Sequence, residues 1–112
     1  MECFRVSVRA VEAWLLADGE CLASFLSVNR RHIPSDPDVV LDPKRAIVDL
    51  AKKSSRREIR EDIAPRPGTT PKVGPAYAAR MIEFANRHWR PDIAAQHSRS
   101  LERFVAAVSV WR

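Results

Sequence analysis

One carboxylate of this chain lies where a carboxylate is costly. Glu12 stands within residues 11–17, and the other six residues of this run are all apolar. A buried carboxylate is unfavourable unless it is paired with a cation or holds one. Two roles for Glu12 therefore stay open: an ion pair with Arg9, three residues earlier on the same helix face, or a metal-binding or acid–base role. Asp18, directly after the run, is the expected N-cap of the next helix.

Basic residues are concentrated between positions 44 and 60. This segment holds seven basic and two acidic residues, so its formal charge of +5 equals that of the whole chain. Such a segment is either a solvated helix surface or a face that contacts phosphates. The residues that we assign to the second alternative, a nucleic-acid-binding face, are Lys44, Lys52, Lys53, Arg56, Arg57 and Arg60.

The longest irregular segment, residues 64–75, is basic and contains glycine. It lacks the Gly-Lys-Ser/Thr ending of a phosphate loop, and no strand is predicted before it. It leads into a helix predicted to begin at Pro75, where backbone amides can hold an anion. Lys72 and Gly74 are the candidate residues of such an anion-binding loop. The alternative is a plain connecting loop.

Other residue types that often do chemistry have simpler explanations here. Asp36 and Asp38 flank Pro37 in a proline-rich connector, which favours a turn over a cation site. Cys3 and Cys21 form no CxxC motif, and no histidine stands at zinc-ligand spacing from them. We therefore expect reduced, buried thiols in a cytoplasmic protein.

The elements that must hold these residues are mostly helices. Alternation over residues 3–8 predicts one short strand. Apolar periodicity and capping residues then predict about six or seven helices. They cover residues 9–17 and 19–26, a stretch from Pro43, a stretch from the capping box Ser55-Arg-Arg-Glu58 to before Pro65, residues 75–89, residues 91–97, and a last helix capped by Ser98.

Length and composition fit one small folded unit. The chain has 112 residues, of which 46% are hydrophobic and 29% charged. This composition is typical of globular proteins, and no run approaches the roughly 18 apolar residues that span a bilayer. We expect a mainly α-helical single domain over residues 1–112, with no membrane partner.

Several segments, taken in order, form a pattern that is more specific than any of them alone. The most specific of them is residues 9–18, Arg-Ala-Val-Glu-Ala-Trp-Leu-Leu-Ala-Asp. Shorter ones are Asp42-Pro-Lys44, Val73-Gly-Pro-Ala-Tyr77, residues 84–89 and Ser98-Arg-Ser-Leu101. Together these segments resemble an uncharacterised bacterial family related to Toprim domains. The resemblance covers about residues 4–108 and corresponds to the C-terminal half of the family.

The resemblance implies the C-terminal part of an α/β Toprim-like fold, with Mg²⁺ held by acidic residues and activity in nucleases, primases or topoisomerases. Genes of the family often lie near those of ATPases, which implies an ATPase partner. Of the family's acids, only Glu12 and Asp18 have counterparts here, as candidate catalytic residues, with Glu12 the candidate metal ligand. We expect a C-terminal fragment or short member, whose Mg²⁺ site needs further acidic residues.

Three functional hypotheses follow. The first is a Toprim-like protein tied to nucleic-acid processing or defence, without a complete magnesium site. The second is a basic helical module that binds nucleic acid or an acidic protein partner without doing chemistry. The third is a structural or regulatory helical protein. Oligomeric state and sequence specificity stay open.

Overall fold

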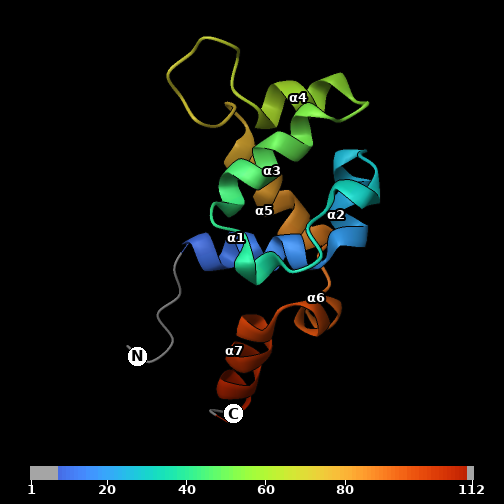
Figure 1. Cartoon of the computed structure of the whole chain (residues 1–112), viewed down its shortest axis with the longest axis vertical. Coiled ribbons are helices and arrows are strands. Elements are labelled where there is room, and N and C mark those ends of the chain that lie inside the picture. The colour runs from blue at the N-terminus through green and yellow to red at the C-terminus, as the bar shows by residue number, and fades with distance from the viewer. Residues whose placement is uncertain (1–7, 111–112) are drawn as a thin grey trace.

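The computed structural model describes residues 8–110, and this part of the chain is mainly helical (Figure 1). It contains no strand. The predicted strand over residues 3–8 lies outside the described residues except for Val8, which begins a helix instead. The helices and 3₁₀ segments of residues 8–110 are α1 Val8–Ala17, α2 Gly19–Leu26, η2 Arg30–His32, η3 Pro37–Val39, α3 Pro43–Lys52, α4 Arg57–Ile63, α5 Tyr77–Arg87, α6 Pro91–His97 and α7 Arg99–Val110.

Helix starts follow the capping chemistry of the sequence at most positions. The Asp18 side chain accepts a hydrogen bond from the Cys21 amide and so caps α2. Asp42 does the same for α3 through the Arg45 amide, with Pro43 in the first turn. Side-chain oxygens at these positions satisfy amides that have no partner within the helix.

The predicted capping box at Ser55 is wrong. Helix α4 begins two residues later, at Arg57, and no side chain caps it. The Ser54 hydroxyl instead accepts from the Arg56 amide at 3.0 Å, and the Arg56 guanidinium donates hydrogen bonds to the Glu58 carboxylate. A capping box would direct the Ser55 amide at the Glu58 carboxylate, but this amide donates to the Ser27 carbonyl at 3.1 Å. The predicted helix over 75–89 is shorter than expected, spanning Tyr77–Arg87.

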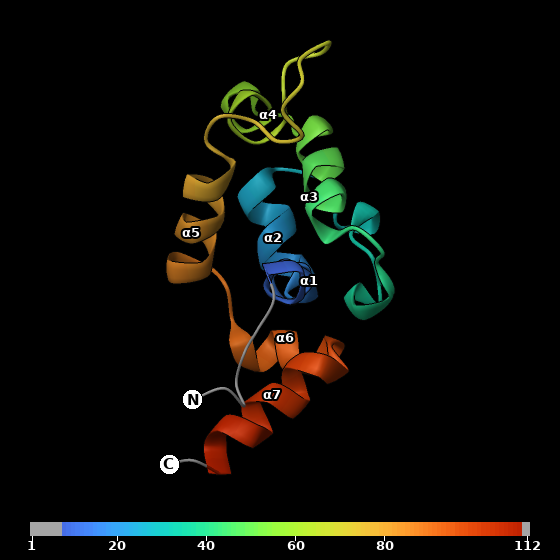
Figure 2. The ribbon, with the colours of Figure 1, turned by 90° about the vertical axis from the view of Figure 1, so that its left-hand side faces the viewer.

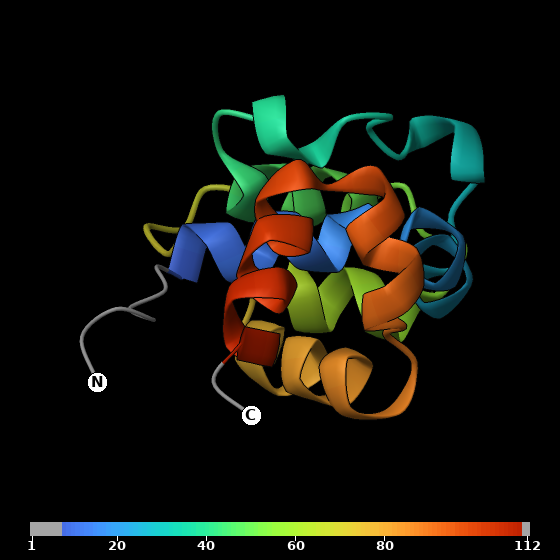
Figure 3. The ribbon, with the colours of Figure 1, turned by 90° about the horizontal axis from the view of Figure 1, so that it is seen from below.

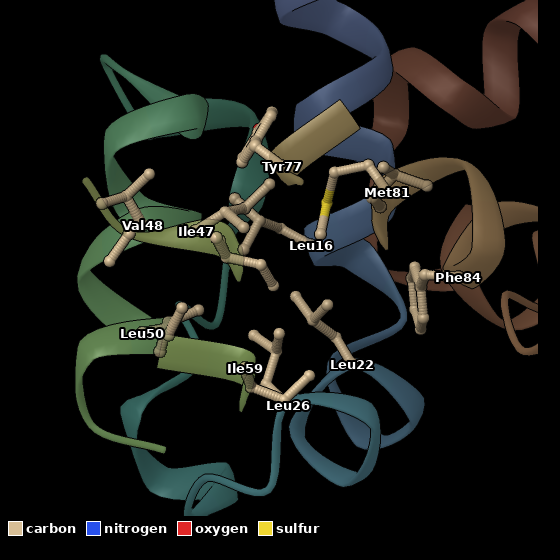
Figure 4. Packing of buried hydrophobic residues seen from close by; sticks show 14 residues of the cluster. Leu16, Leu22, Leu26, Ile47, Val48, Leu50, Ile59, Tyr77, Met81 and Phe84 are labelled. Atoms are coloured by element: carbon tan, nitrogen blue, oxygen red, sulfur yellow. The ribbon is translucent and has the colours of Figure 1, made fainter. Parts of the chain in front are cut away.

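The main core is formed where α1 to α5 meet (Figure 4). Its fully buried members include Leu16 of α1, Leu22 and Leu26 of α2, Ile47 of α3 and Phe84 of α5. Fully burying one such side chain is worth about 1.5–3 kcal/mol relative to leaving it exposed. This core is what fixes α3 and the loop before α5 relative to each other.

A second, smaller cluster joins the last two helices to α1. Trp14 and Ala17 of α1 pack there against Ala94 of α6 and Leu101 of α7. Trp89, in the connection between α5 and α6, packs against both clusters. Helices α6 and α7 therefore lie under α1, and the molecule is elongated, with principal extents of 46 × 28 × 25 Å (Figures 2 and 3).

Candidate phosphate-binding site

Glu12 is buried on α1, with 7% of its surface exposed, and its partner lies on α5. The Tyr77 hydroxyl donates a hydrogen bond of 2.5 Å to the Glu12 carboxylate. The alternative of an ion pair with Arg9 is not seen among residues 8–110, and Arg9 is exposed. Burial, together with the bond to Glu12, raises the pKa of Tyr77 far above its ordinary value.

Asp18 is fully buried and joins α1–α2 to the segment between α5 and α6. Besides capping α2, it accepts from the guanidinium of Arg90 through both oxygens, at 2.8 and 3.1 Å, and from the Arg90 amide at 2.9 Å. Burial alone would raise the pKa of Asp18. The hydrogen bonds from Arg90 and Cys21 outweigh that effect and hold the pKa below its ordinary value.

These surroundings do not fit Asp18 as a magnesium ligand. Both of its oxygens face a guanidinium cation, which would repel Mg²⁺ from the same carboxylate. Glu12 is committed to Tyr77, and residues 8–110 hold no cluster of three or more Asp, Glu, His or Cys side chains. Asp18 caps α2 and holds Arg90 in this fold, and its catalytic role stays a prediction. The catalytic or metal-binding role of Glu12 stays a prediction.

The predicted basic residues meet in a different place, between α3 and the loop that precedes α5. Lys44 and Lys52 of α3 and Lys72 of the loop line one groove of about 280 Å³. We call it the lysine groove; its other lining residues are Asp42, Arg45, Val48, Asp49 and Pro65. Lys44, Val48 and Lys52 stand four positions apart, so one helix face presents all three.

The lysine groove keeps a net positive charge, because its four basic side chains outnumber its two carboxylates. Asp42 is used as the cap of α3. Asp49 lies 3.9 Å from both Arg45 Nε and Lys52 Nζ, and all three side chains are about half exposed or more. Exposed pairs at such distances are worth little. Four basic side chains facing two carboxylates make this groove a place where an anion is attracted.

The other predicted phosphate-binding residues lie outside the lysine groove. Arg56 pairs with Glu58, and Arg57 pairs with Glu61 at 2.8 Å. Arg60 is partly buried and donates to the Ser54 carbonyl at 2.6 Å, which ties α4 to the end of α3. Lys53 is exposed beyond the last turn of α3. The structure thus brings Lys44 and Lys52 to the site and adds Arg45.

Gly74 has a packing role in the loop. Its amide donates to the Ile63 carbonyl at 2.7 Å, so this amide is used within the chain. A Cβ at position 74 would lie 2.5 Å from the Asp62 carbonyl oxygen and 2.8 Å from that of Ala64. Only glycine allows this close approach of two backbone segments. This close approach holds the loop, and with it Lys72, against the end of α4.

Arg45 was missed as a site residue although its signal was present. It belongs to the counted basic segment, and its distance of seven residues from Lys52 is two helical turns. Val48 lies between them, and an apolar residue at this position does not by itself indicate a groove. The contribution of Pro65 and Lys72 follows from how the loop folds back, which no local pattern indicates.

Comparisons of the chain with protein-family models, with curated proteins and with solved structures find no match. The Toprim-like resemblance, with the magnesium ion and ATPase partner that it implies, therefore stays a prediction. Within residues 8–110, no helix is long and apolar enough to cross a membrane.

Proposed function

We propose that this protein binds the phosphate backbone of nucleic acid through the lysine groove and does so without reading base sequence. The observation that carries the proposal is the meeting of Lys44, Arg45, Lys52 and Lys72 in one groove, from two segments that are distant in sequence. Lysine and arginine side chains that neutralise phosphates supply most of the affinity in such complexes.

The composition of the groove favours backbone contact over base contact. No aromatic side chain is among the described residues that line it. Proteins that hold single strands stack the bases on aromatic rings, whereas contacts to a duplex backbone need only donors and positive charge. A duplex is therefore the ligand that this groove suits best. The Toprim-like resemblance points the same way, since such domains act on DNA.

The salt dependence of binding tests the proposal. A 16-base-pair DNA duplex with a fluorescent label is titrated with protein at several salt concentrations, and the anisotropy gives the affinity. We expect the logarithm of the affinity to fall linearly with that of the salt concentration. The triple variant Lys44→Gln, Lys52→Gln, Lys72→Gln should lower the slope by about 3, because each phosphate contact contributes about 0.9.

A matched control separates the groove from net charge. The variant Arg30→Gln, Arg31→Gln, Arg87→Gln removes the same charge from exposed positions outside the groove. It should keep a slope within about 1 of the unmodified protein. Equal losses in both variants would show diffuse attraction and would overturn the proposal, as would the absence of salt-dependent binding by the unmodified protein.

A further inference from the structure

A second, larger groove of about 560 Å³ lies where α1, η3 and α7 approach one another. We call it the arginine groove, because Arg9 of α1 and Arg99 and Arg103 of α7 line it. Arg99 and Arg103 are one helical turn apart and therefore lie on one face of α7. Arg9 comes from the other end of the chain. None of the basic residues assigned above from sequence belongs to this groove.

The three arginines are available for a ligand. All three are exposed, and within residues 8–110 none of them forms an ion pair. A guanidinium presents paired N–H donors in a plane, which matches two oxygens of one phosphate. An unpaired set of three such groups around one groove is the arrangement expected of a site for phosphate oxygens.

The two acids of the arginine groove have partners of their own. Asp38 accepts from the hydroxyls of Ser98 and Ser100 and from the Ser100 amide, at 2.7 to 3.0 Å. Asp36 accepts from the Asp38 amide at 3.2 Å. Asp38 thereby anchors the first turn of α7 to η3 and sets where Arg99 and Arg103 stand. These carboxylates build the groove and are not matched to its arginines by any ion pair in the described chain.

The two grooves adjoin at the start of α3. Pro43 lines the arginine groove, while its chain neighbours Asp42 and Lys44 line the lysine groove. In Figure 2, α1 is seen nearly end-on near the middle of the molecule, with α3 above it and α7 below it. The segments that line the two grooves are therefore stacked along the long axis in the order loop before α5, α3, α1 and α7.

We infer that the arginine groove contacts a second stretch of the same nucleic-acid backbone, so that one duplex lies along both grooves. This inference rests on the proposed function of the lysine groove. Like that groove, the arginine groove has no aromatic side chain among the described residues that line it, so backbone contact again suits it. The long axis of 46 Å corresponds to about 14 base pairs at roughly 3.4 Å each.

The test compares the two grooves in one assay. The variant Arg99→Gln, Arg103→Gln should lower the salt slope for a 16-base-pair duplex by about 2, and adding Arg9→Gln should bring the loss to about 3. The variant Arg99→Lys, Arg103→Lys should keep the original slope, because it keeps the charge. The variant Arg31→Gln, Arg87→Gln is the matched control and should leave the slope within about 1 of the original.

The possible outcomes are distinguishable. If the arginine variants keep the full slope while the lysine-groove variant loses it, the inference is overturned and the proposed function stands. If neither groove affects the slope, both fail. The source of the phosphate is tested with duplexes that carry or lack a 5′-phosphate. Equal binding is expected for a backbone site, and a requirement for the 5′-phosphate would overturn the inference in favour of a site for a terminal phosphate.

Discussion

The hydroxyl of Tyr77 donates a hydrogen bond of 2.5 Å to the carboxylate of Glu12, across 65 positions of sequence. Both residues are buried, Glu12 on α1 and Tyr77 in the first turn of α5. The bond explains how a carboxylate is tolerated in an apolar helix. It also holds the start of α5, and thus the loop that carries Lys72, against α1.

Removing that hydroxyl should destabilise the fold. Tyr77→Phe leaves the buried Glu12 carboxylate without its partner, and we expect a loss of about 2 kcal/mol in the free energy of unfolding. Urea denaturation followed by circular dichroism measures it. Glu12→Gln should cost less, since an amide oxygen can still accept from Tyr77. An unchanged unfolding midpoint in Tyr77→Phe would show that the bond contributes nothing.

Asp18 should make stability depend on acid pH. Because the pKa of Asp18 is lower in the folded protein than its ordinary value of 3.8, the ionised carboxylate favours folding. This contribution is fully present above the ordinary pKa and is lost as the pH falls through the lowered one. Asp18→Asn should therefore lower the melting temperature at pH 7 and narrow the difference between pH 7 and pH 3.

The control for this prediction is Asp92→Asn, an exposed acid at the start of α6. It should leave the dependence of the melting temperature on pH close to that of the unmodified protein. If the melting temperature of Asp18→Asn falls between pH 7 and pH 3 as much as that of the unmodified protein, the stabilising role of the pair of Asp18 and Arg90 is contradicted.

Gly74 should not tolerate a methyl group. The Cβ of Gly74→Ala would meet two backbone carbonyl oxygens, at 2.5 and 2.8 Å, and neither can move aside as a flexible side chain would. We expect a loss of about 1–3 kcal/mol in the free energy of unfolding. Gly68→Ala is the comparison: its φ of +79° is strained for alanine, but no atom lies within 4 Å of the added carbon. Equal tolerance of both substitutions would refute the close approach at position 74.

Removing a carboxylate from the lysine groove should strengthen binding to DNA. Asp49 stands between Arg45 and Lys52, so Asp49→Asn leaves both cations free for phosphate. One unit charge at close range in water is worth about 1 kcal/mol, which corresponds to roughly a fivefold gain in affinity. Glu20→Gln makes the same change of net charge on α2, away from both grooves, and should change the affinity less. Equal gains would indicate that only net charge matters.

Most of the helical fold could be predicted from sequence because its signals are local. Asp18, Asp42 and Pro43 place two helix starts through chemistry that acts within a turn. The connection of Glu12 to Tyr77 and that of Asp18 to Arg90 could not be predicted, since each joins residues more than 60 positions apart. For Glu12, the sequence offered Arg9 as a nearby partner, and tertiary packing supplied a hydroxyl instead.

The candidate site was predicted in part for the same reason. Lys44 and Lys52 share a helix face, and that much follows from their spacing. The same basic segment contains Arg56, Arg57 and Arg60. The first two form ion pairs with neighbouring acids, and Arg60 donates to a backbone carbonyl. The arginine groove could not be predicted, because its arginines come from both ends of the chain and belong to no basic segment.

The most direct test of the central claim is to map where a duplex touches the protein. A ¹⁵N-labelled sample is titrated with a 16-base-pair DNA duplex, and amide chemical shifts are followed by NMR. Binding through the lysine groove predicts the largest shifts at α3 and around Lys72, and none of that size on α2. Shifts concentrated on α2 and α5, or a spectrum that does not change, would contradict it.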